Sequence, residues 1–103
     1  MKVLLTIAAT ALLAVSVTPA FAQGAGAATY KAKCQMCNGA DGQPTAAGKS
    51  MKALPFNSPE LKKASTASLI ASVTNGKGKM PAYAGKLTDA QIKEVVEYVR
   101  TLQ

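Results

Sequence analysis

The chain has 103 residues, of which 49% are hydrophobic and 5% aromatic, and it carries 12 basic and 5 acidic side chains but no histidine. This length allows one small domain and leaves no room for a second. The net charge of +7 raises nucleic acid as a partner. The lysines are dispersed and form no cluster with arginine, so we expect no nucleic-acid binding.

The first 22 residues are typical of a secretory signal peptide. A lysine at position 2 precedes an apolar run over residues 3–17. Residues 20–22 form an A-x-A pattern, so we expect cleavage after Ala22 and export to the periplasm. The apolar run is shorter than the roughly 20 residues of a spanning helix, so we expect no stable membrane insertion after cleavage.

The expected mature domain, residues 23–103, retains 11 basic and 5 acidic side chains, which give a net charge of +6. A domain this small is marginal on its own core, and natural ones usually add a disulfide, a metal or a cofactor. Four aromatic residues remain after the cut, namely Tyr30, Phe56, Tyr83 and Tyr98. A large flat cofactor would fill the centre that these side chains leave open.

The first half of the mature domain predicts one helix and a long loop. Residues 24–36 are rich in alanine and predict a helix that carries the two cysteines at its C-terminal end. Glycine and proline residues between positions 39 and 55 predict an irregular loop. Ser58 and Pro59 then predict the N-cap and the first position of a short helical turn.

The next helix is expected to start at a cap of Ser65 or Thr66 and to end at Asn75-Gly76. Its inner face is expected to carry Leu69, Ile70 and Val73. A second glycine-rich loop follows over residues 76–86.

The last helix is the best determined element. Thr88 and Gln91 form a capping box, and Leu87 and Ile92 occupy the positions of a hydrophobic staple. Helical spacing predicts one apolar face made of Ile92, Val95, Val96, Val99 and Leu102. No segment alternates as a strand would, so the predicted class is all-α with long loops.

The sequence Cys34-Gln35-Met36-Cys37-Asn38 carries the chemistry. Two cysteines at this spacing followed by histidine form the attachment signature of c-type haem, and here asparagine stands in the fifth position. Iron in electron-transfer haem proteins commonly takes His and Met as axial ligands. Met80, followed by proline in the second loop, is the methionine best placed for that role.

Other uses of a Cys-x-x-Cys pair fit less well. A structural zinc site needs four nitrogen or sulfur ligands, and the chain has two cysteines and no histidine. A thioredoxin-like motif expects a βαβ context, which the pattern lacks. A plain Cys34–Cys37 disulfide in an oxidising compartment stays open.

Several segments together carry a family resemblance. Gly26 and Tyr30 precede Cys34 by eight and four residues, residues 38–42 follow the second cysteine, and residues 78–83 surround the methionine. With the last helix, these patterns cover nearly the whole mature domain. The domain resembles the small class I c-type cytochromes of bacteria, which carry a single haem.

The resemblance implies a compact bundle of three to five helices around one covalently bound haem c. Gly26 and Tyr98 would let the first and last helices cross closely. Cys34 and Cys37 would carry the haem thioethers, and Met80 would be the distal ligand of the iron. Family members have histidine, the proximal ligand, where this chain has Asn38.

Three consequences of Asn38 stay open. In the first, the haem is never attached. In the second, it is attached and the iron is bound by Met80 and water, or by Met80 alone. In the third, the asparagine is a recent or artificial change in an otherwise ordinary carrier. The main hypothesis is a monomeric periplasmic one-electron carrier that is not an enzyme. The alternatives are a haem-free domain closed by a Cys34–Cys37 disulfide and an open-site haem with weak peroxidase activity.

The expected partners are redox proteins. Five lysines flank the two candidate cofactor segments, namely Lys49, Lys52, Lys77, Lys79 and Lys86. These lysines could simply keep the protein soluble, or they could form a basic rim that steers acidic redox partners.

Overall fold

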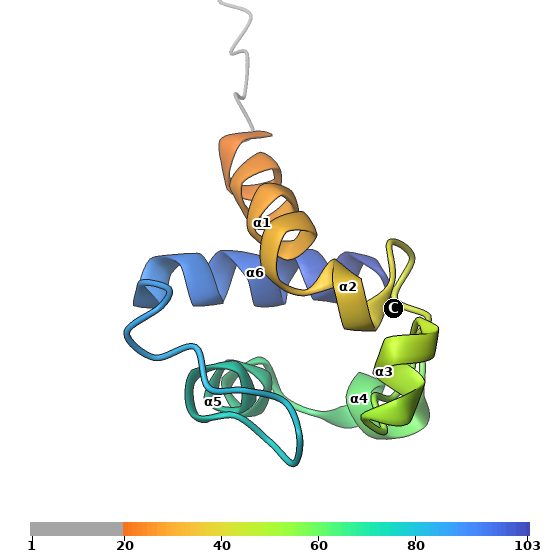
Figure 1. The fold of residues 1–103 in the computed structure, drawn as a ribbon. Helices are drawn as coiled ribbons and strands as arrows, with labels where there is room; N and C mark the ends of the chain where they lie inside the picture. The colour runs from red at the N-terminus through yellow and green to blue at the C-terminus, as the bar shows by residue number, and fades with distance from the viewer. Residues whose placement is uncertain (1–19) are drawn as a thin grey trace, which may run out of the picture.

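The computed structural model describes residues 20–103, which form six helices joined by long connections (Figure 1). The helices are α1 (Ala20–Lys33), α2 (Gln35–Asn38), α3 (Ala46–Ser50), α4 (Pro59–Lys63), α5 (Thr66–Asn75) and α6 (Asp89–Thr101). Within these residues no strand occurs, only isolated bridges between Lys77 and Met80 and between Ala84 and Leu87. The all-α class is confirmed.

The expected signal segment, residues 1–22, lies outside the described residues except for its last three positions, where the backbone of α1 begins. Among residues 20–103, no helix combines the length and apolar character that crossing a membrane requires.

The centre of the fold is the crossing of α1 over α6 (Figure 1). Gly26 is buried at this crossing, and a Cβ placed on it would overlap the backbone carbonyl of Glu94 and lie 3.3 Å from the Cβ of Tyr98. The expectation that Gly26 and Tyr98 let the first and last helices approach closely is therefore confirmed.

The capping box predicted at the start of α6 is also confirmed. The Thr88 hydroxyl accepts a hydrogen bond from the Gln91 backbone N–H at 3.1 Å, and the Thr88 N–H donates to Gln91 Oε1 at 2.9 Å. Two otherwise unpaired helix-end donors are thereby satisfied. The predicted apolar face of α6 points inward, with Ile92, Val95 and Val96 buried.

The packed core is small. Among the described residues, the buried hydrophobic side chains are Tyr30, Phe56, Ile92, Val95 and Val96. Tyr30 stands at its centre, with its ring 6.0 Å from that of Phe56 and 5.2 Å from that of Tyr98. Helix α5 has no fully buried residue, although Leu69, Ile70 and Val73 pack partly against this core. The inner face of α5 is therefore only half covered by protein.

Two predicted elements differ from the structure. The helix expected over residues 24–36 ends at Lys33, and the second cysteine lies in the separate short helix α2. The loop expected over residues 39–55 contains helix α3, capped by Thr45, whose hydroxyl accepts from the Gly48 N–H. The break between α1 and α2 arises where residues from other segments hydrogen-bond to this turn, whereas α3 begins at the local cap of Thr45. The short helix α4 begins after Ser58 as expected, and α5 takes Ser65 as its cap.

Candidate functional site

A cavity of about 800 Å³ lies between α1, α2, α5, α6 and the loop that follows α5. This volume lies within the roughly 300–1,000 Å³ range of small-molecule sites. Its walls are largely apolar and include Tyr30, Leu54, Phe56, Leu61, Leu69, Val73, Val95, Val96 and Val99. The half-covered face of α5 borders this cavity, so a bound molecule would complete the core.

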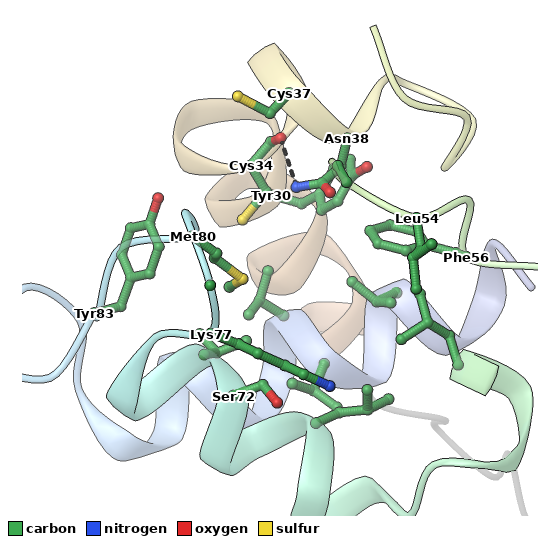
Figure 2. Close-up of a pocket in the computed structure, with 18 of the residues that line it drawn as sticks. Tyr30, Cys34, Cys37, Asn38, Leu54, Phe56, Ser72, Lys77, Met80 and Tyr83 are labelled. Carbon is green, nitrogen blue, oxygen red and sulfur yellow. Dashed lines mark hydrogen bonds between the residues drawn. The ribbon is translucent and has the colours of Figure 1, made fainter. Parts of the chain in front are cut away.

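Both cysteines line the cavity as free, half-buried thiols. Cys34 follows the last residue of α1, and Figure 2 shows its sulfur pointing into the space that Met80 borders. Burial raises the pKa of the Cys34 thiol to about 11, so this thiol stays protonated at neutral pH. Reactive redox cysteines have lowered pKa values, so the surroundings of Cys34 differ from those of a disulfide-exchange site.

Hydrogen bonds from a distant segment hold the helical turn of α2 in place. The Thr45 hydroxyl donates to the Met36 carbonyl at 2.6 Å, and the Thr45 N–H donates to the Cys37 carbonyl at 3.0 Å. Gly48 packs directly on the Cys37 carbonyl, where a Cβ would overlap that group. Sequence reasoning missed Thr45 and Gly48, although a threonine before an Ala-Ala pair is a typical N-cap signal.

Tyr30 fixes the other end of this turn. Its hydroxyl donates to the Gly39 carbonyl at 2.5 Å, directly after Asn38. Burial raises the pKa of the Tyr30 phenol well above its usual value, so the group remains a neutral donor. Removing a buried donor of this kind leaves its acceptor unpaired and typically costs about 1–3 kcal/mol.

Asn38 borders the same cavity as the cysteines. Its side-chain Nδ2 donates to the Cys34 carbonyl at 3.1 Å, and its backbone N–H donates to the same oxygen at 3.0 Å (Figure 2). One side-chain donor is thus used within the turn that carries the cysteines. The side chain is partly buried and offers the cavity a neutral carboxamide.

Met80 reaches the cavity from the loop between α5 and α6 (Figure 2). A tight turn presents it, because the backbones of Lys77 and Met80 exchange hydrogen bonds at 3.0 and 3.2 Å. Tyr83 then ties the loop to the rest of the fold. Its N–H donates to the Val73 carbonyl at 2.9 Å, and its hydroxyl donates to the Lys33 carbonyl at 3.1 Å.

The structure therefore brings the four predicted site residues to one cavity, although Asn38 and Met80 lie 42 positions apart in the sequence. Tyr83 contributes to this arrangement, since its hydroxyl donates from the methionine loop to the carbonyl of the residue before Cys34. The sequence analysis named Tyr83 only as one of four aromatic residues and as the end of the resembling segment 78–83. The long-range hydrogen bond that defines its role has no local signal.

Exposed lysines surround the cavity. Lys33, Lys52, Lys77 and Lys79 border it, with Glu60 as the single acidic residue among the described lining residues. Three of the five lysines singled out in the sequence are therefore at the rim, whereas Lys49 and Lys86 are not among the lining residues. Lys33 was not expected there. Two exposed methionines, Met36 and Met51, also border the cavity.

Comparisons with known proteins agree on one family. Residues 21–99 match the family described as cytochrome C oxidase, cbb3-type, subunit III. A cytochrome c6 of Synechococcus sp. is 36% identical over 96% of this chain and 91% of its own length. A cytochrome c6 of Leptolyngbya boryana is 39% identical over 73% of this chain and 86% of its own.

A solved structure shares the fold. The KustC0563 c-type cytochrome superposes with a TM-score of 0.71 at 31% identity, and the match covers 76% of this chain and 96% of that one. The arrangement of helices around the cavity is thus similar to that of a c-type cytochrome.

Proposed function

The chain belongs to the cytochrome c family, whose members bind haem and carry electrons, and we propose that it is a monomeric periplasmic one-electron carrier. Membership in this family makes the chain an electron-carrier cytochrome and not an enzyme, and attachment of haem to this chain is part of the proposal. One observation carries the one-electron-carrier part of the proposal: a large apolar cavity is bordered by both cysteine thiols and by Met80.

Most of the site suits a haem. The cavity is large, apolar and half covered by α5, and the only two cysteines of the chain lie within one helical turn at its wall. Met80 could supply a thioether, the type of ligand that raises the reduction potential of cytochromes c. The donor set lacks a nitrogen ligand, because the chain has no histidine and Asn38 follows Cys37. The cavity and thiols fit the group, whereas the axial donors do not complete its coordination.

Cys34 and Cys37 are proposed to anchor the haem covalently. Each thiol adds across one vinyl double bond, so that sulfur bonds to one vinyl carbon and the thiol hydrogen goes to the other. No atom is lost, and no oxidant is needed. The bound iron would supply the reversible one-electron change. The apolar side chains of Val95 and Val96 would pack against the bound group, and Tyr83 ties the Met80 loop to the residue before Cys34.

Intact mass after expression with c-type maturation factors tests this proposal. We expect a coloured protein whose mass equals residues 23–103 plus one whole haem, which also tests cleavage after Ala22. Cys34→Ser with Cys37→Ser should abolish the covalent adduct. A colourless product two hydrogens lighter than the reduced chain would instead support the haem-free alternative with a Cys34–Cys37 disulfide.

The lysines at the cavity rim support acidic redox proteins as partners. Lys52, Lys77 and Lys79 are exposed there, while the acidic residues of the mature domain are few. Complementary charge chiefly raises the rate of encounter. We therefore expect electron transfer to an acidic partner to slow as salt rises from 10 to about 150 mM, because the screening length falls from about 30 to about 8 Å.

The matched variants for this prediction are Lys79→Gln at the rim and Lys93→Gln, an exposed lysine of α6 that does not border the cavity. Lys79→Gln should lower the low-salt rate and flatten its salt dependence more than Lys93→Gln does. Equal effects of the two variants, or a rate that salt does not change, would remove the role of the rim.

A further inference from the structure

The two axial positions of a haem in this cavity would meet very different side chains. Iron in electron-transfer haem proteins takes two axial ligands, commonly histidine and methionine. Met80 borders the cavity from the loop after α5, and Asn38 borders it from α2. Histidine is absent from all 103 residues, so no imidazole of this chain can serve.

Asn38 is a poor substitute for that nitrogen ligand. A carboxamide nitrogen is a hydrogen-bond donor without an available lone pair. Asn38 Nδ2 is also already paired, since it donates to the Cys34 carbonyl at 3.1 Å. The remaining oxygen is neutral, and the hydrogen bond keeps the side chain within the turn rather than free to reach across the cavity.

Among the described residues that line the cavity, the tyrosine hydroxyls are committed elsewhere, the two other methionines are exposed and the lysines are charged. The Tyr30 hydroxyl donates to the Gly39 carbonyl, and burial raises its pKa, so it does not form a phenolate at neutral pH. The Tyr83 hydroxyl is bonded to the Lys33 carbonyl. Met36, between the cysteines, and Met51 border the cavity, but both are exposed, Met36 to 80% and Met51 to 38%. The lysines at the rim carry ammonium groups, which donate but do not accept.

The geometry points to a ligand site: we propose that Asn38 leaves one axial position open, and that a small neutral diatomic ligand such as carbon monoxide binds there. This inference rests on the proposed haem attachment. The asparagine side chain is smaller than that of histidine but still borders the cavity, so we expect the position to suit a ligand of two heavy atoms. Binding there requires no displacement of Met80, which serves the other position.

Titration of the reduced, haem-loaded full-length mature chain with carbon monoxide tests the proposal. The visible spectrum should change at low ligand concentration in the natural chain. Asn38→His should give a six-coordinate low-spin iron in which the open form is a minor population of about 0.1–10%. Because apparent affinity scales with the competent fraction, carbon monoxide should bind Asn38→His about 10–1,000-fold more weakly.

Asn38→Ala provides the matched control, since it removes the carboxamide without adding a ligand. Its affinity for carbon monoxide should stay close to that of the natural chain, whereas a large increase would mean that Asn38 Oδ1 occupies the position. A low-spin, six-coordinate spectrum of the natural chain before any ligand is added would overturn the open position, whatever the variants do. Equal affinities of the natural chain and Asn38→His would do the same.

These experiments distinguish failure of the carrier function from failure of the ligand site. A colourless chain overturns the proposed carrier function and, with it, the ligand site. A coloured chain with a covalent haem that ignores carbon monoxide overturns the ligand site alone and leaves the carrier function standing.

Discussion

Gly26→Ala is expected to lower the free energy of unfolding by about 1–3 kcal/mol, the cost typical of forcing an extra carbon into a packed contact. A Cβ on Gly26 would overlap the backbone carbonyl of Glu94, and a backbone group of a helix cannot move aside as a flexible side chain can. Helices α1 and α6 would have to separate. Urea unfolding of the haem-loaded protein, followed by circular dichroism, measures this loss.

Gly24→Ala is the control, because a Cβ at Gly24 would have nothing within 4 Å. It makes the same chemical change in the same helix without the clash. It should raise the free energy of unfolding by at most about 0.5–1 kcal/mol, through the lower backbone entropy of alanine in a helix. If both variants shifted stability in the same direction by the same amount, the close crossing at Gly26 would not be what holds the two helices.

Met80→Ala is expected to remove the thioether-to-iron absorption band and to lower the reduction potential. Methionine ligation raises the potential of haem proteins, so its loss should lower it. A shift on the order of 0.1–0.3 V is reasonable within the roughly 0.8 V that axial ligands span. The visible spectrum and a redox titration of the haem-loaded variant measure both changes.

Met51→Ala and Met36→Ala are matched controls, because both methionines border the cavity but are exposed. Each should keep the band and a potential close to that of the natural chain. Loss of the band in Met51→Ala with its retention in Met80→Ala would mean that the wrong methionine has been assigned as ligand. Because Met80 lies in a tight turn held by Tyr83, its position should be insensitive to either control substitution.

Functional chemistry was more predictable from the sequence than the path of the backbone that supports it. The spacing of Cys34 and Cys37 and the glycine-rich setting of Met80 are local patterns, and they identified the residues that the fold gathers at one cavity. Thr45 and Tyr83, which hold these residues in place, were not identified as positioning residues. Their partners lie eight or more residues away in the sequence, and no short pattern specifies such pairs.

Helix α6 follows from the sequence alone, because its capping box and its apolar spacing involve residues within one or two turns of each other. The break between α1 and α2 was decided by tertiary structure. Alanine-rich residues 24–36 favour one continuous helix, but Thr45 bonds to the carbonyls of Met36 and Cys37, and Tyr30 bonds to that of Gly39. These contacts compete with helix propensity, which is weak per residue, and redirect the chain at Cys34.

The absence of histidine could be read directly from the 103 residues, since it is a property of composition. The hydrogen bonding and exposure of the side chains near Asn38 could not be predicted from the composition. Only the folded chain engages the hydroxyls of Tyr30 and Tyr83 with backbone carbonyls and exposes Met36, because burial and hydrogen bonding depend on segments that meet in space. The missing histidine is therefore evident from the sequence, whereas the engagement of Asn38, Tyr30 and Tyr83 in other hydrogen bonds is a result of the tertiary structure of residues 20–103.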